Sequence, residues 1–401
     1  MKAMVIRKIY VQKKVGIGKR KILQKETNMK NMKVAFILFL LIAFLQAAVV
    51  NPDKPLEGEW DFKLKKVWEI DRAGDDLLGK PFSLTATEDG ILYVYDAANQ
   101  INYIFDKDGN FIRAFARSGQ GPGEIIGQEL IHYVNGKVYI PAMNGINLFT
   151  KDGVYIQTVK QEGRPLDPRI ILNGDEIISA PKTAVFLPDG KGKIIRKNIK
   201  TGNETVISEF SIQDWGIAQS GERVVDIIAI GFSPLMILGY AENRLYWGMN
   251  TSYMINVTDL SGKKINSFSL KRRSKKVSDK FKKKYFESPN LPEEMLNQIA
   301  EGFPDKISFF HRIEIHNGLV YVFIPDVDLK SKTAKLKQID IFSLEGEYLY
   351  RAYIKFEKNR HHLFSPLNSL VIQNRHLYAV LMDEEYNVLV AKYKIALPNG
   401  N

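Results

Sequence analysis

Short runs of alternating apolar and polar residues, separated by turn signals, fill the chain from residue 62 onward. The clearest set lies in residues 82–124, where four strand-like runs are broken twice by Asp-Gly, at Asp89-Gly90 and at Asp108-Gly109. Asp-Gly between β-branched and aromatic residues is a strong hairpin signal, because glycine adopts the positive φ that a tight turn requires. This stretch therefore predicts one four-stranded antiparallel unit.

The same spacing of hairpins recurs along the rest of the chain. A second unit covers residues 130–159, and its Gly136 lies 46 residues after Gly90, a period typical of propeller blades. Looser units follow over residues 169–210, 225–270, 313–354 and 369–395. The sixth unit has only three strands, and the isolated run Phe62–Ile70 can supply the fourth. We therefore expect an all-β fold, a six-bladed β-propeller of four-stranded antiparallel blades closed by the N-terminal strand.

One segment departs from the β pattern. Residues 271–304 lie between the fourth and fifth units, and within them 277–287 and 293–302 are expected to be helical. Pro292 followed by Glu293 and Glu294 fits the start of a helix, and Gly302 fits its end. We expect a short helical insertion between blades four and five.

The first 48 residues form a basic leader. A basic stretch, Met29–Lys33, precedes the apolar run Val34–Leu45 and small residues, which is the pattern of a secretory signal peptide. The alternative is a retained N-terminal anchor, which would be the only contact with a membrane. Both place residues 49–401 outside the cytoplasm, in the periplasm, secreted or anchored facing outward. Met29 or Met32 makes a more ordinary start than Met1.

The net charge of +12 is concentrated in two places. Residues 1–48 hold 11 Lys and Arg against Glu26 alone, and residues 271–284 hold nine basic residues against Asp279. The remainder is slightly acidic, so we expect no nucleic-acid partner. The absence of cysteine excludes disulfides, thiolate metal sites, a cysteine nucleophile and a lipid-bearing cysteine.

Blade one resembles a repeat of the NHL type. The resemblance covers Ile91–Glu124, through the aromatic-Val-x-Asp end of its second strand, the Asp-x-Asp-Gly hairpin and the Gly-Pro-Gly-Glu exit at residues 121–124. It is similar to the six-bladed propellers that Bacteroidetes-like and related bacteria export. This resemblance implies the fold and an extracytoplasmic binding role, and it fixes no single activity.

Function is expected on one face of the disc, which we call the long-loop face. The second-to-third strand breaks and the connections between blades share this face, and they hold the long segments, whereas the other face has tight turns. Long loops on a rigid scaffold usually carry binding residues. The ligand-binding candidates there are Asn99, Gln100, Arg117, Gln120, Asn144, Lys182, Asn250, Tyr253, Asp326, Arg360, His361 and Asp383.

The leading hypothesis is an exported, non-enzymatic propeller that binds an unknown protein, small molecule or glycan and carries no cofactor. An alternative is a propeller hydrolase or lactonase with a metal such as Ca²⁺ at the channel mouth, held by Asp96, Asp326 and Asp383. These carboxylates sit where strands end, and the competing interpretation is that each caps its own turn. A third hypothesis is a scaffold subunit that docks through the helices of 271–304.

Overall fold

The computed structural model describes residues 48–128, 130–160, 168–181, 187, 189–212, 217–220, 223–226, 231–278, 281–282, 293–301, 303–328, 333–357, 359, 361–362 and 369–398. The chain divides into two compact units, Met1–Ala48 and Val49–Asn401. The leader lies outside the described residues except for Ala48. The second unit holds all the strands and the helix described below.

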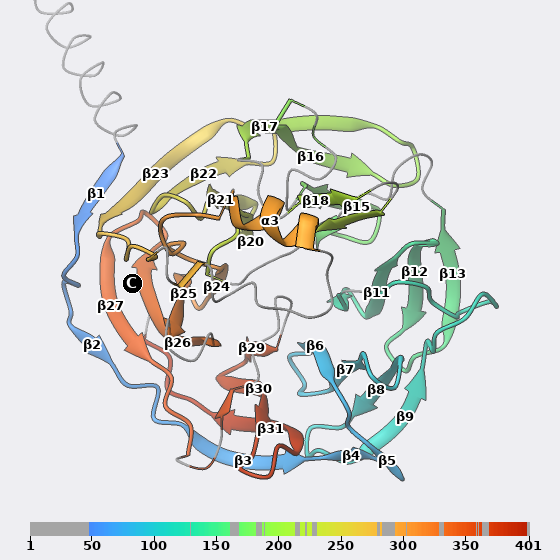
Figure 1. Cartoon of the computed structure of the whole chain (residues 1–401). Coiled ribbons are helices and arrows are strands. Elements are labelled where there is room, and N and C mark those ends of the chain that lie inside the picture. The colour runs from blue at the N-terminus through green and yellow to red at the C-terminus, as the bar shows by residue number, and fades with distance from the viewer. Residues whose placement is uncertain are drawn as a thin grey trace, which may run out of the picture. The chain divides into compact units, whose positions relative to one another are not determined.

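Six β-sheets are arranged as blades around a centre (Figure 1). Blade one has β6 (Pro81–Ala86), β7 (Leu92–Asp96), β8 (Ile101–Phe105) and β9 (Phe111–Phe115). Blade two has β10 (His132–Val134), β11 (Lys137–Ala142), β12 (Gly145–Thr150) and β13 (Tyr155–Val159), and blade three has β14 (Pro168–Ile171), β15 (Glu176–Ser179), β16 (Lys191–Asn198) and β17 (Glu204–Ser211).

The remaining three blades continue the ring. Blade four has β20 (Met236–Ala241), β21 (Arg244–Met249), β22 (Met254–Asp259) and β23 (Lys264–Lys271). Blade five has β24 (Arg312–His316), β25 (Leu319–Asp328), β26 (Thr333–Ser343) and β27 (Tyr348–Tyr353). Blade six has β29 (Leu370–Gln373), β30 (His376–Met382) and β31 (Val388–Lys394). The expected six-bladed, all-β propeller is confirmed.

The ring closes as predicted. Strand β3 (Lys65–Ile70) pairs antiparallel with β31 and becomes the outer strand of blade six. Its Trp68 ring covers the turn of blade one, where a Cβ added to Gly109 would lie 3.1 Å from the indole. Each contact between neighbouring blades, the one between blades six and one included, holds a cluster of buried apolar side chains from the described residues. The core is thus distributed around the ring.

The polar stretch before β3 also pairs with the sheets, which the sequence did not predict. Strand β1 (Val49–Pro52) adds in parallel to β23 of blade four, and β2 (Glu59–Trp60) adds in parallel to β27 of blade five. Figure 1 shows this blue segment following the outer rim of the ring toward β3. We call residues 49–60 the belt. Because β1 and β2 cover the edges of β23 and β27, they remove two exposed strand edges.

The long-loop face carries the insertion. Helix α3 (Glu293–Glu301) confirms the second expected helix, and it packs against β18 (Ile217–Ser220), which forms a hairpin with β19 (Arg223–Asp226). Of the first expected helix, 277–287, only residues 277–278 and 281–282 are described, and 281–282 are helical. At the base of the insertion, the backbones of Lys276 and Lys306 pair in an isolated antiparallel β-bridge.

Three details differ from the expectation. Residues 223–226, expected to open blade four, pair with 217–220 in a separate hairpin, so blade four begins at Met236. Residues 325–328 and 333–335, expected to be a loop, extend β25 and β26 as paired strands. A short strand, β28 (His361–His362), pairs with β30 in the connection after blade five, and β4 (Arg72–Ala73) and β5 (Asp76–Leu77) form a small hairpin before blade one.

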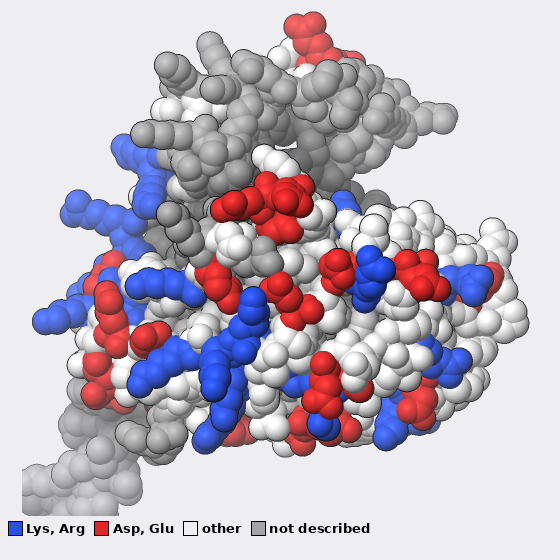
Figure 2. Space-filling view, turned by 90° about the horizontal axis from the view of Figure 1, so that it is seen from below, with Lys and Arg blue, Asp and Glu red and all other residues white. Residues whose placement is uncertain are grey.

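Among the described helices, none is long and apolar enough to cross a membrane. The side of the disc drawn in Figure 2 mixes Lys and Arg with Asp and Glu, with no continuous basic surface in view among the residues that the structure describes. This agrees with the charge distribution expected from the sequence.

Candidate functional site

The exit of blade one forms a folded loop on the long-loop face, over residues 116–128. The amide of Ile125 donates to the carbonyl of Arg117 (3.0 Å), and the amide of Ser118 donates to the carbonyl of Gln100 (2.9 Å). The Glu124 carboxylate accepts from the Gly121 amide (2.9 Å), and a Cβ added to Gly119 would lie 2.1 Å from Glu124 Oε2. The Gly-rich motif is therefore a structural turn between blades, as its sequence suggested.

This loop walls a cavity of about 200 Å³ beside blade one. It is lined by Tyr95, Ala97, Gln100, Ala116, Ser118, Ile125, Gly127 and Gln128. We call it the blade-one cavity. Gln128 is buried, and its amide exchanges two hydrogen bonds with the amide of Asn102, at 2.7 and 2.8 Å. Asn102 also donates to the carbonyl of Ala116 (2.9 Å), which fixes the cavity wall.

Three polar side chains of the cavity have no hydrogen-bond partner among the described residues. These are the Tyr95 hydroxyl, the Gln100 amide and the Ser118 hydroxyl. A tyrosine hydroxyl is protonated at neutral pH, and burial, aided by the charge of Asp96, raises the pKa of Tyr95 further. The cavity thus presents uncharged donors and acceptors, and none of the described residues that line it is charged.

The rim of the cavity combines apolar and polar side chains. Met143 is 70% exposed and Ile126 is 36% exposed, and the Met143 amide donates to the Ile126 carbonyl (2.9 Å). Asn144 donates to the Glu124 carbonyl (3.3 Å), while Arg117 and Gln120 are exposed on the loop itself. Four of the sequence-derived candidates, Gln100, Arg117, Gln120 and Asn144, therefore gather at this cavity and its rim.

The other candidates are placed elsewhere. Asn250 and Tyr253 are buried: Asn250 bonds the backbone of Ser233 and Leu235, and Tyr253 donates to Asp340. Exposed Asn99 donates to the Leu77 carbonyl and to the Tyr103 hydroxyl. Lys182 and Arg360 lie outside the described residues, as do the side chains of Asp326 and His361.

The carboxylates considered as metal ligands are held by local amides. Asp96 is fully buried and accepts from the backbone of Gly79 (2.7 Å), Lys80 (2.9 Å), Ala98 (2.9 Å) and Asn99 (3.1 Å). Asp383 accepts from the amides of residues 385 and 387 in its own turn. Among the described residues, no three His, Asp or Glu side chains are grouped to hold a metal ion. The arrangement of Asp96 and Asp383 is that of turn caps.

Replacement of Asp96 by alanine should therefore destabilise the fold. It leaves buried amides without an acceptor, and we expect a loss of about 2–3 kcal/mol in the free energy of unfolding by denaturant titration. A chelator should leave the unfolding midpoint of the unaltered protein unchanged. A midpoint that falls with chelator and recovers with Ca²⁺ would instead favour the metal site.

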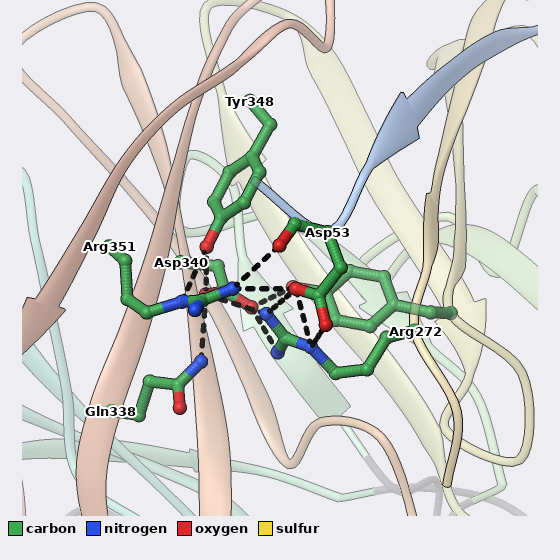
Figure 3. Close-up of polar contacts among 7 residues, drawn as sticks. Asp53, Arg272, Gln338, Asp340, Tyr348 and Arg351 are labelled. Carbon is green, nitrogen blue, oxygen red and sulfur yellow. Dashed lines mark hydrogen bonds and ion pairs between the residues drawn. The ribbon is translucent and has the colours of Figure 1, made fainter. Parts of the chain in front are cut away.

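A second polar cluster lies on the rim between blades four and five (Figure 3). At its centre, the fully buried Asp340 of β26 accepts from the hydroxyls of Tyr253 and Tyr348 (2.7 Å each), and from Arg272 (2.6 Å). On the belt, Asp53 pairs with Arg272 (2.7 Å) and Arg351 (2.6 Å). We call the set the rim network: Asp53, Tyr253, Arg272, Gln338, Asp340, Tyr348 and Arg351.

The rim network joins three segments far apart in the sequence. Burial alone lowers the pKa of Arg272, but the hydrogen bonds that its guanidinium donates to Asp53 and the charge of Asp340 raise that pKa above its ordinary value. Burial also raises the pKa of Tyr253, which keeps its proton for Asp340. The carboxylates and guanidinium groups are already paired with one another, so the network fastens the belt to blades four and five. Sequence reasoning missed it because the three segments that form it, at residue 53, residues 253–272 and residues 338–351, are separated from one another by more than 60 residues.

A largely buried charged row lies on the innermost strand of blade five. Every second residue of β24 is charged or titratable and lies on one face: Arg312, Glu314 and His316. The Glu314 carboxylate forms an ion pair with Arg312 and lies 2.8 Å from His316 Nε2. Tyr321 of β25 stands opposite Glu314, and its ring meets the imidazole edge-on at 5.6 Å. Burial and the Arg312 charge lower the pKa of His316 to about 4.

This row predicts a pH dependence of stability. His316 is neutral in the fold, whereas its pKa is about 6.5 in the unfolded chain. The unfolded state therefore binds more protons between pH 4 and 6.5, and stability falls as pH is lowered through that window, by up to about 3 kcal/mol. Denaturant titrations at pH 7 and 4.5 should show this loss, and His316→Gln should reduce it. An imidazole signal of His316 that titrates near pH 6.5 would contradict the assignment.

Comparisons with known proteins agree with the fold. A family model described as a six-bladed β-propeller matches residues 74–129, which span blade one and its exit loop. A Bacteroides fragilis protein named as a candidate exported protein superposes with a TM-score of 0.51 at 13% identity, over 88% of this chain and 100% of that one. No curated protein matches the sequence.

A second solved structure is a member of the DUF4221 family from Bacteroides vulgatus. It has a TM-score of 0.49 at 14% identity, over 84% of this chain and 99% of that chain. At such identities the likeness concerns the fold alone. The family match and the six blades confirm the expected resemblance to six-bladed propellers, and the narrower NHL name is not confirmed.

Proposed function

We propose that this chain is an exported, non-enzymatic β-propeller that binds a partner through its long-loop face, at the blade-one cavity. The observation that carries the proposal is the convergence of three unpartnered, uncharged polar groups, from Tyr95, Gln100 and Ser118, on one cavity among the described residues. A few polar groups converging on a concave surface are typical of binding sites, because they are available to pair with an incoming molecule.

Export is supported by the leader. Basic residues followed by the apolar run Val34–Leu45 fit a signal peptide or an N-terminal anchor. The Bacteroides fragilis protein of similar fold is itself named as a candidate exported protein. The absence of cysteine is compatible with a periplasmic or secreted location, because export does not require disulfides.

The rival functions receive less support. A metal-dependent hydrolase would need carboxylates free to bind the ion, and Asp96 and Asp383 are occupied by backbone amides. A scaffold docking through the insertion would need an available apolar face on α3. Met295 of that helix is fully buried, and α3 already packs against β18.

The proposal is tested by affinity capture with matched variants. The full-length chain is used as bait in envelope extract of its source organism, alongside Gln100→Ala/Ser118→Ala and the control Lys200→Ala. Lys200 lies in the turn between β16 and β17, on the face opposite the long-loop face. A specific partner should be retained by the unaltered and control chains and lost by the double variant. Equal capture by all three chains would place the contact elsewhere and refute the proposal.

A further inference from the structure

The size of the blade-one cavity restricts what can enter it. Its volume of about 200 Å³ is smaller than the range of roughly 300–1,000 Å³ usual for sites that enclose a small-molecule ligand. A single side chain of a partner protein fits such a volume, in the way that an anchor residue fills a pocket at a protein–protein interface. The exposed Met143 and Ile126 beside it offer apolar area for the surrounding contact.

The chemistry of the lining restricts the occupant further. A charged side chain would be buried without an opposite charge, because none of the described residues that line the cavity is charged. An apolar side chain would cover the hydroxyls of Tyr95 and Ser118 and the amide of Gln100 and leave them without partners. The occupant must therefore be uncharged and must both donate and accept hydrogen bonds.

The neighbouring Asn102 and Gln128 indicate which group satisfies these conditions. Their amides form a reciprocal pair, with one bond of 2.8 Å and one of 2.7 Å. Gln100 lines the cavity and is exposed, and its side-chain amide makes no hydrogen bond among the described residues. An incoming amide can complete a second reciprocal pair with Gln100, while Tyr95 and Ser118 satisfy its remaining donor and acceptor sites.

Resting on the proposed function, we infer that the blade-one cavity binds the amide side chain of an Asn or Gln of a protein partner. The amide enters as an anchor between blade one and its exit loop, and Met143 and Ile126 contact the partner surface around it. Arg117, exposed on the same loop, lies outside the lining and contacts the partner at the rim.

The inference is tested with three soluble probes and the full chain by saturation-transfer NMR. N-acetylglutamine N-methylamide and N-acetylglutamate N-methylamide have nearly the same shape, differ in charge and carry a primary amide only in the glutamine side chain, and glucose represents a neutral sugar. We expect the glutamine probe to bind at least about tenfold more tightly than the glutamate probe, a difference of about 1.4 kcal/mol. Gln100→Ala should abolish the preference, and Lys200→Ala should leave it unchanged.

Several outcomes would overturn the inference. These are equal binding of the glutamine and glutamate probes, binding of glucose with neither amino-acid probe, no binding of any probe, or a preference that survives Gln100→Ala. If the probes fail while the double variant still loses its captured partner, the proposed function stands and the amide anchor is wrong. If capture is also unaffected by the double variant, both proposals fall.

Discussion

A chain that starts at residue 61 should be less stable by roughly 5 kcal/mol than one that starts at residue 48. It lacks β1 and β2, and with them Asn51, which makes three hydrogen bonds to blades four and five. It also lacks Trp60, whose indole donates to the Ala396 carbonyl (2.9 Å) and packs against Tyr350. Denaturant titration of the two chains measures the difference.

This pair of chains isolates the belt from the leader, because both lack residues 1–47 and both keep β3. The shorter chain should also self-associate, since the edges of β23 and β27 are then open to pairing with another molecule. Light scattering at increasing protein concentration reports this. Superimposable unfolding curves for the two chains would mean that the belt contributes nothing to the fold.

Asp340→Ala should lower the free energy of unfolding by about 3–5 kcal/mol. The carboxylate is fully buried and accepts from Tyr253, Tyr348 and Arg272 within 2.7 Å. Its removal leaves Arg272 largely buried with only Asp53 as a counter-charge among the described residues, and leaves two buried hydroxyls without their acceptor. The effect is measured by thermal and denaturant unfolding.

Two further variants locate the cause. Asp340→Asn keeps the volume of the side chain and removes its charge, so it separates the effect of the lost charge from the effect of the lost side-chain volume. Asp305→Ala removes a carboxylate that is also ion-paired, with Lys282, but whose side chain is 85% exposed, and it should leave the unfolding midpoint almost unchanged. Equal losses for Asp340→Ala and Asp305→Ala would show that burial of the rim network does not matter.

The blades could be predicted because each is encoded locally. Asp108-Gly109 and Asn135-Gly136 mark hairpins whose strands alternate apolar and polar residues, and both turns are found with glycine at positive φ. Ring closure could be predicted from the number of strands, because blade six lacked a fourth strand and the strand Phe62–Ile70 lacked a hairpin partner. Strands β1 and β2 could not be found in this way, because they pair in parallel with distant strands and no turn marks them.

The candidate site was predicted only in part. Gln100 and Asn144 lie in the turns between the second and third strands of blades one and two, and Arg117 lies in the exit loop of blade one, as topology indicates; topology could not reveal that Asn250 and Tyr253 turn into the core. Whether a polar side chain on a loop binds a ligand or its own backbone depends on local hydrogen bonds, as for Asp96. The unpartnered state of Tyr95 and Ser118 likewise depends on neighbours that the sequence does not identify.

Photo-cross-linking in living cells of the source organism tests most directly that the blade-one cavity is the contact with a partner. Benzoylphenylalanine is placed at Met143, on the cavity rim, and separately at Lys200, on the opposite face. We predict a discrete adduct of higher mass from position 143, none from position 200, and loss of the first in combination with Gln100→Ala. Adducts from position 200 alone, or an adduct from position 143 that persists with Gln100→Ala, would contradict the proposed contact.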